Sequence, residues 1–379
     1  MATYSKQLLS GGTNGKNNCL RGLIVFRQDR TNPSSAVSNW NGRRDTAKGW
    51  PSTAVSSWLN GGLFGGGGAI YAGYLAGGNN TSPWKSADKL SFPDEVGSTL
   101  ADVLQLNTGW TSGFSNNGVA GYTGAGYVST YYPSGSPKIQ KLLYGSDTPV
   151  NLTDLPDVAA SSGTGSPGYG VGSCSNSGTA GYIAGGTGRV SGVTYTSNKA
   201  VKYPYATETP AMTGNILTYS SGVYVGDMAG NTAGGNGYWF GGIRSTQSDE
   251  ISKLVFASDT GSVITGTTTI AGYYTRACAN EGTASYTTMG VGGTGANTTV
   301  QKMPFASETP AALSTGLSSG RTYMGCFGDK DVAVYFGDAG GINEYDRFAT
   351  ASDTRTVIDG GGGGGASNGP SGFSNSANW

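Results

Sequence analysis

Alternating hydrophobic and polar positions recur along most of this chain at a nearly steady interval. The clearest copy is VQKMPFASETP at 300–310, and similar stretches read ISKLVFASDT at 251–260 and VKYPYATETP at 201–210. In each copy an aromatic residue and the residue two before it share one face of a strand, and a lysine three before it lies on the other face. This alternation is typical of a half-buried β-strand, and the polar cluster after it predicts a turn.

Six copies of this strand can be placed in register by their aromatic residue. The aromatics follow one another at similar intervals, as Phe92, Tyr144, Tyr205, Phe256, Phe305 and Phe348. The sixth copy departs from the pattern, because Tyr345 and Asp346 stand where the others have lysine and an apolar residue. A repeat of this length indicates that the chain is built from one structural unit.

Two further strands are predicted before each copy. An aromatic and apolar run that ends in Gly-Gly, such as GYIAGG at 181–186, predicts a strand whose end needs positive φ or close backbone approach. A strand of small residues precedes it, and there Cys174, Cys278 and Cys326 take one repeat position as small core residues. With a Thr/Ser-rich strand after the turn, each unit has four short strands, which is the size of a propeller blade.

The fold predicted from these units is all-β, a six-bladed β-propeller over residues 61–358. The double-glycine strand ends resemble kelch repeats, although the usual downstream tryptophan is missing. The first unit begins weakly with GGLFGGGGAIYAG, so we expect the ring to close through the C-terminal strand around TRTVI at 354–358. Residues 1–60 lack the unit and are expected to order against a partner, and residues 359–379 are expected to form a flexible, glycine-rich tail.

Composition narrows the chemistry that this fold could carry. The chain has 67 glycines in 379 residues and no histidine, which excludes Ser-His-Asp and Cys-His nucleophiles and histidine-ligated metals. The acidic residues after each repeated aromatic are periodic, whereas a catalytic carboxylate pair would be unique, so we expect them to bond to turn amides or to the periodic lysines. These acids are Asp147, Glu208, Asp259, Glu308 and Asp353. No cofactor, metal site or catalytic residue is predicted.

Charge is unevenly distributed along the chain. Residues 1–60 contain eight lysines and arginines but two acids, whereas the whole chain is neutral. A basic leading segment before an acidic body indicates separate tasks of docking and display, and a solvated basic loop is the alternative. The docking residues that we expect are Lys6, Lys16, Arg21, Arg43, Arg44, Trp40, Trp50 and Trp58.

Exposed aromatics are the candidate ligand-binding residues. Tyr131, Tyr132, Tyr273 and Tyr274 lie in polar stretches between predicted strands and could stack on sugars, with packing inside the protein as the alternative. Trp239 lies within a double-glycine strand and is expected to pack between blades. The N-terminus has no apolar run of signal-peptide length and the chain has none of membrane-spanning length, so we expect folding in a cytoplasm and no membrane insertion.

Two stretches carry a resemblance to known proteins. The opening MATYSKQLLSGGTNGKNN resembles the start of virion structural proteins of tailed phages, especially cyanophages. The repeats of the GYIAGG and FASDT type resemble kelch-like repeats of phage and marine-virus structural proteins. The resemblance implies a virion protein assembled in the host cytoplasm in several copies, with other virion proteins and a host-surface glycan as partners and no nucleic acid.

The same resemblance implies a tail-associated fibre or adhesin that displays its propeller for host-surface contact. Two alternatives stay open at this point. One is a decoration protein on the capsid surface, and the other is a glycan-processing propeller enzyme that works through carboxylates alone.

Overall fold

The computed structural model divides the chain into two compact units, Met1–Gly66 and Gly67–Trp379. It describes residues 4–7, 24–27, 71–78, 85–105, 109, 111–124, 126, 138–155, 169–190, 193–196, 199–215, 217, 229–233, 235–242, 248–264, 276–280, 283–288, 291–292, 295–321, 324–330, 332–337, 344–359 and 369–375. These residues form strands, turns and bends, with no helix among them. In the first unit, β1 (Tyr4–Gln7) and β2 (Ile24–Arg27) pair as antiparallel strands.

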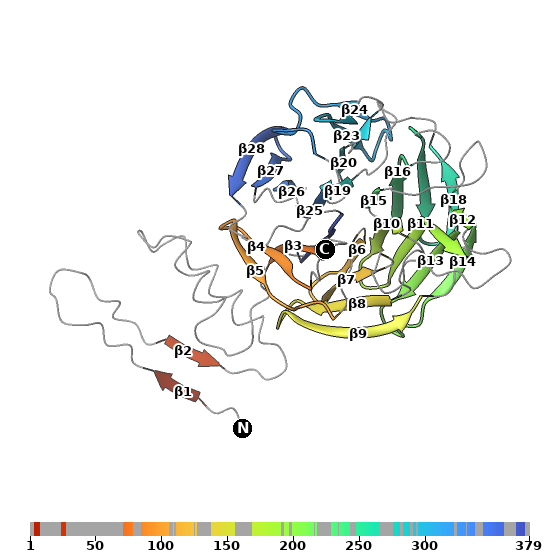
Figure 1. The fold of residues 1–379 in the computed structure, drawn as a ribbon. Coiled ribbons are helices and arrows are strands. Elements are labelled where there is room, and N and C mark those ends of the chain that lie inside the picture. Colours follow the sequence, from red (N-terminus) through yellow and green to blue (C-terminus); the bar gives the residue numbers. More distant parts are fainter. Residues whose placement is uncertain are drawn as a thin grey trace. The chain divides into compact units, whose positions relative to one another are not determined.

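The second unit is a six-bladed β-propeller, as predicted (Figure 1). Blade 1 consists of β29 (Ser371–Asn375), β3 (Ala72–Ala76), β4 (Ala87–Ser91) and β5 (Val96–Leu100). Blade 2 consists of β6 (Ser112–Asn116), β7 (Ala120–Gly124), β8 (Lys138–Leu143) and β9 (Thr148–Asp154). Blade 3 consists of β10 (Tyr169–Asn176), β11 (Ala180–Val190), β13 (Lys199–Pro204) and β14 (Ala211–Asn215). Blade 4 consists of β15 (Ala229–Ala233), β16 (Asn236–Phe240), β17 (Ile251–Val255) and β18 (Thr260–Val263). Blade 5 consists of β19 (Arg276–Asn280), β20 (Ala284–Thr288), β23 (Val300–Pro304) and β24 (Ala311–Ala312). Blade 6 consists of β25 (Gly325–Asp329), β26 (Ala333–Gly337), β27 (Glu344–Ala349) and β28 (Thr354–Asp359). In addition, β12 (Val193–Thr196) pairs with β11, and β21 (Val291–Gly292) pairs with β22 (Gly295–Ala296).

The ring closes through a different strand from the one expected. The TRTVI stretch is β28, the outer strand of blade 6, whereas β29 near the C-terminal end pairs with β3 and completes blade 1. Residues 371–375 therefore belong to the propeller, although they were expected in a flexible tail. Their sequence SGFSN is identical to residues 112–116, which form the innermost strand of blade 2. Two identical strands thus occupy the same position in neighbouring blades.

Blade 6 is shifted relative to the register predicted from its aromatic residue. In the other blades the repeated tyrosine lies opposite the repeated lysine, as Tyr238 does opposite Lys253. In blade 6 the tyrosine Tyr335 lies opposite Arg347, so Arg347 replaces the lysine. Thr350, and not Phe348, then stands at the place of the repeated aromatic. The prediction was wrong because an aromatic residue happens to lie two positions before the true register position.

The cysteines also need one correction. Cys174 and Cys278 each lie opposite the repeated tyrosine of their blade, Tyr182 and Tyr286. Cys326 instead lies opposite Phe336, so it does not share their repeat position. Cys174 and Cys326 are both buried free thiols, which agrees with a role as small core residues.

The core lies between blades, where aromatic rings of one blade pack on the next. The ring of Phe256 in blade 4 stacks on that of Tyr182 in blade 3 with centroids 5.1 Å apart. Corresponding stacks join Tyr74 to Tyr144 at 5.4 Å and Tyr238 to Phe305 at 5.3 Å. Each buried ring of this size contributes about 1.5–3 kcal/mol through burial alone. The repeated aromatic of the sequence is therefore the contact between neighbouring blades.

Glycine before the repeated tyrosine makes room for a ring from the preceding blade. A Cβ at Gly121 would lie 2.0 Å from the ring of Phe373, which belongs to blade 1. In the same way, a Cβ at Gly181 would lie 2.1 Å from the ring of Phe114. The Gly-Tyr pair of the repeat is thus a packing requirement. The double glycine at the other end of these strands has the expected positive φ, with 73° at Gly77 and 130° at Gly78.

Candidate functional site

A cluster of a cation, a tyrosine and an acid recurs at every junction between blades. Lys253 Nζ of blade 4 lies 2.5 Å from Glu308 Oε1 of blade 5, and the Tyr238 hydroxyl donates to the same oxygen at 2.9 Å. The corresponding ion pairs are Lys89–Asp147, Lys141–Glu208, Lys202–Asp259, Lys302–Asp353 and Arg347–Glu95. We call these six contacts the junction ion pairs. The last of them joins blade 6 to blade 1 and so closes the ring.

The acids of the junction ion pairs are held in an unusual backbone conformation. Asp259 and Glu308 both have φ of 51°, in the left-handed region, and the other four acids have φ between 51° and 55°. This conformation turns the chain after the third strand of a blade and aims the carboxylate at the preceding blade. The acid in turn affects its neighbours, because burial and the Asp259 carboxylate together raise the pKa of Tyr182 well above its usual value.

Of the two roles expected for the periodic acids, bonds to turn amides or to the periodic lysines, the structure shows pairing with the lysines. The set of repeated acids drawn from the sequence did not include the sixth acid, Glu95. The sequence interpretation also missed Arg347, because the register of blade 6 was misplaced. Both residues could have been found from the offset of six between cation and acid, which Lys89 to Glu95 and Arg347 to Asp353 share with every other copy. Each of these acids therefore already has a structural role between blades.

Substituting Asp259 tests both the ion pair and its backbone. Asp259→Ala removes the bonds to Lys202 and Tyr182 and leaves a Cβ at positive φ, whereas Asp259→Gly removes the same bonds but relieves the backbone. We expect both variants to lose stability, with the glycine variant more stable than the alanine variant by about 1 kcal/mol. Urea denaturation measures the difference.

The control is Ala257→Gly, two residues earlier in the same turn, where φ is not positive. There glycine is expected to lower stability by about 0.5–1 kcal/mol, which is the usual order. An alanine variant at 259 as stable as the glycine variant would contradict the interpretation.

Asp329 introduces an extra carboxylate beside the junction of blades 6 and 1. It ends the innermost strand of blade 6, where the other blades have asparagine at four of five places: Asn116, Asn176, Asn280 and Asn375. Burial and the nearby Glu95 carboxylate raise the pKa of Asp329 to about 6, and Arg347 partly opposes this shift. This carboxyl group is therefore protonated in mildly acidic solution in the folded protein.

The contribution of Asp329 to the stability of the folded protein is expected to fall as pH rises. Between pH 3.8 and about pH 6 the folded protein keeps the Asp329 proton, whereas the unfolded chain has largely lost it. The free energy of unfolding therefore falls as the pH rises through this range. Asp329→Asn should raise the free energy of unfolding at pH 7 by about 1 kcal/mol, a value reduced for partial exposure, and leave it unchanged at pH 4. Urea titrations from pH 4 to 7 measure this, with the exposed Asp94→Asn as control. An equal gain at both pH values would argue against the assignment.

The two faces of the ring differ in their connections. On the face with the junction ion pairs, short turns join the third strand of each blade to the fourth and, in blades 2 to 6, the first strand to the second, as from Asn116 to Ala120. On the opposite face the second strand of each blade ends and the third begins, and the fourth ends before the next blade begins, with longer stretches of sequence between these strand ends, as from Asp154 to Tyr169. We call this opposite face the loop face. Recognition sites on rigid scaffolds lie on such longer and variable connections.

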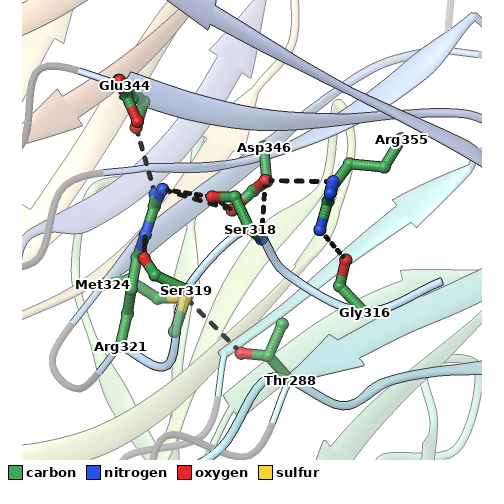
Figure 2. Close-up of polar contacts among 9 residues, drawn as sticks. All are labelled: Thr288, Gly316, Ser318, Ser319, Arg321, Met324, Glu344, Asp346 and Arg355. Atoms are coloured by element: carbon green, nitrogen blue, oxygen red, sulfur yellow. Dashed lines mark hydrogen bonds and ion pairs between the residues drawn. The ribbon is translucent and has the colours of Figure 1, made fainter.

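One connection of the loop face is fastened by a buried ionic cluster (Figure 2). Asp346, fully buried in β27, accepts hydrogen bonds from the backbone N and the hydroxyl of Ser318, both at 3.0 Å. Arg321 Nη2 lies 3.3 Å and Arg355 Nε 3.7 Å from the carboxylate, so two cations flank one acid. Arg355 also donates to the carbonyl of Gly316 at 2.7 Å. The connection from blade 5 to blade 6 is thus bonded to blade 6 at several points.

The guanidinium of Arg321 completes the cluster. It donates to the hydroxyls of Ser318 and Ser319 and to the carbonyl of Glu344, and its side chain is 1% exposed. Buried charges that are paired and hydrogen-bonded fix a conformation more than they add stability. The bonds of Arg321 stay within the cluster, which therefore supports this connection of the loop face.

The predicted site residues have different outcomes. Trp239 is fully buried in a core cluster with Cys174 and Tyr182 of blade 3, which confirms that it packs between blades. Tyr131, Tyr132, Tyr273 and Tyr274 lie outside the described residues, as do seven of the eight docking residues: Lys16, Arg21, Arg43, Arg44, Trp40, Trp50 and Trp58. The eighth, Lys6, is part of β1.

The described part of the chain shows neither a group that would hold a metal nor a membrane-spanning helix. No three His, Cys, Asp or Glu residues among the described ones gather as metal ligands would. No described helix has the length and apolar character needed to cross a membrane. Comparison with known proteins adds no family, since no protein-family model matches the chain and no curated protein matches it either.

Proposed function

We propose that this chain is a structural protein of a tailed-phage particle, a tail-associated fibre or adhesin that displays its propeller for contact with the host surface. The observation that carries the proposal is the structural difference between the two faces of the ring. The junction ion pairs hold neighbouring blades together on one face, whereas the longer connections between strands belong to the loop face. A rigid ring with long connections on one side suits recognition.

We also propose that the protein works without catalysis. The acids of the junction ion pairs are engaged between blades, and the cluster around Asp346 fastens a connection. The chain has no histidine. These features favour a binding platform over a carboxylate-dependent glycan-processing enzyme.

Docking to the particle is assigned to residues 1–60, which carry the basic excess of the chain. The separation of the chain into units at Gly66 supports a division between docking and display. In this proposal the partners of the first unit are other virion proteins, in several copies per particle, and the loop face meets a host-surface glycan.

Locating the chain in purified particles tests the proposal. Cryo-electron microscopy of phage particles containing the full chain should show a six-bladed disc on the tail, and a chain that lacks residues 1–60 should not be incorporated. Density on the capsid shell would instead assign it as a decoration protein, and absence from particles would overturn the proposal. New reducing ends after incubation with host polysaccharide would contradict the non-catalytic role.

A further inference from the structure

We propose that the position of β29 in blade 1 is a sequence-selective acceptor for a strand, and that a second copy of this chain can fill it with its own residues 371–375. This goes beyond the proposed function and does not depend on it. The starting point is that SGFSN, at 112–116 and at 371–375, forms the innermost strand of two neighbouring blades. We call the position of β29 the acceptor slot.

Both ends of the strand are recognised by side-chain hydrogen bonds. The Ser371 hydroxyl is fully buried and bonds to the carbonyl of Ala76 at 3.1 Å and to the Thr123 hydroxyl at 2.7 Å. At the other end, the Asn375 side-chain oxygen accepts a hydrogen bond from the backbone N of Gly118 at 2.8 Å. The acceptor slot therefore favours a hydroxyl at the first position and an amide at the fifth.

The middle of the strand is recognised by shape. A Cβ at Gly372 would lie 1.7 Å from the carbonyl oxygen of Cys326, so the second position accepts glycine alone. The Phe373 ring stacks on Tyr74 at 5.4 Å and lies 6.3 Å from Tyr144, over the space that Gly121 leaves open. The third position therefore favours a large flat ring. A strand with the wrong order of small and large residues would not fit.

The copy in blade 2 is held by the same kinds of contact. The Phe114 ring stacks on Tyr122 at 5.0 Å, and the Asn116 side chain accepts a hydrogen bond from the backbone N of Gly178 at 3.1 Å. A Cβ at Gly113 would lie 2.6 Å from the carbonyl oxygen of Gly372. The occurrence of one pentapeptide in both blades, with similar contacts, indicates that the innermost positions of blades 1 and 2 favour this sequence, whereas the innermost strands of the other blades differ.

Nothing in these contacts requires that the strand belong to the same chain. β29 pairs with β3 and lies between β25 and β6, whereas β28, the strand before it in the sequence, pairs with β27. A strand from another copy would make the same bonds in the same register. Closure within one chain has an effective concentration on the order of millimolar, so exchange between copies is expected near that protein concentration.

A full-length variant with an open acceptor slot allows a direct test. Gly372→Val prevents the chain's own strand from seating, and Gly145→Val, at a position with no atom within 4 Å of the added Cβ, is the matched control. A fluorescein-labelled peptide GPSGFSNS, and the same peptide with alanine for phenylalanine, are titrated against both variants and followed by anisotropy. We expect one peptide per Gly372→Val chain, bound at least tenfold more tightly with phenylalanine, and no binding to Gly145→Val.

Equal binding of the two peptides, or no binding to a folded Gly372→Val chain, would overturn the proposal. If circular dichroism shows that this variant is unfolded, the wild-type chain decides. After warming and cooling at about 1 mM, it should form dimers or larger species on size exclusion with light scattering. An excess of the labelled GPSGFSNS peptide should suppress these species and elute with the chain. A wild-type chain that stays monomeric and excludes the peptide would refute strand exchange.

Discussion

Replacing Asp346 with alanine is expected to lower the free energy of unfolding by about 3–5 kcal/mol, as seen when one partner of a buried ion pair is removed. The change leaves the Arg321 guanidinium, whose side chain is 1% exposed, without its carboxylate. It also removes the acceptor of the Ser318 backbone N and hydroxyl. Urea denaturation followed by tyrosine and tryptophan fluorescence measures the loss.

Two further variants separate the buried charge from the rest of the cluster. Arg355→Met removes the second cation, whose side chain is 30% exposed, and is expected to cost under about 1 kcal/mol. The double variant Asp346→Leu with Arg321→Met removes both buried charges and should recover much of the stability that Asp346→Ala loses. A loss below about 1 kcal/mol for Asp346→Ala would show that the charge of Arg321 is not buried as described.

Replacing Gly121 with alanine is the second change with a large expected effect. The new Cβ would lie 2.0 Å from the Phe373 ring, so the closing strand has to shift, and overpacking of this kind costs about 1–3 kcal/mol. Phe373→Ala alone is expected to cost about 3–5 kcal/mol through the cavity that it leaves. Because the two residues occupy the same space, the double variant should cost less than the sum of the single changes. Urea denaturation of all four proteins gives this coupling energy.

The chain itself contains the compensated combination. Blade 5 has Cys278 where blade 1 has Phe373, and the next blade has Val334 in place of glycine before its tyrosine. The control is Gly145→Ala, where the new Cβ meets open space, and it should change stability by less than about 0.5 kcal/mol. Additive losses in the double variant would contradict the packing interpretation.

The blade architecture could be predicted because the residues that pack one blade on the next recur in each repeat. Alternation around Lys253 and Phe256 predicted a half-buried strand with these two residues on opposite faces, and in the structure Lys253 contacts the next blade and Phe256 the preceding one. For the turn residue Asp259 the sequence left two roles open, a bond to turn amides or a pair with a periodic lysine, and the structure shows the pair with Lys202. Such contacts are encoded locally, since every copy repeats both partners at fixed offsets.

Ring closure and the Asp346 cluster were missed for different physical reasons. β29 follows a run of six glycines and is rich in small residues, so hydrophobic alternation gives no signal there, and identity with residues 112–116 is the mark that could have revealed it. The partners Ser318 and Arg321 of Asp346 come from the preceding connection between blades, which has no repeat pattern. Contacts of this kind depend on the path of the backbone and not on local periodicity.

The closing strand also sets the order in which the protein can be completed. The Ser371 hydroxyl bonds to the carbonyl of Ala76, a separation of 295 residues, so the first blade stays one strand short until the ribosome has made residues 371–375. During that time the edge of β3 is open to pairing with other nascent strands. Assembly in the cell therefore depends on the time between the synthesis of β3 and that of β29, and slow translation of the glycine run would lengthen this time.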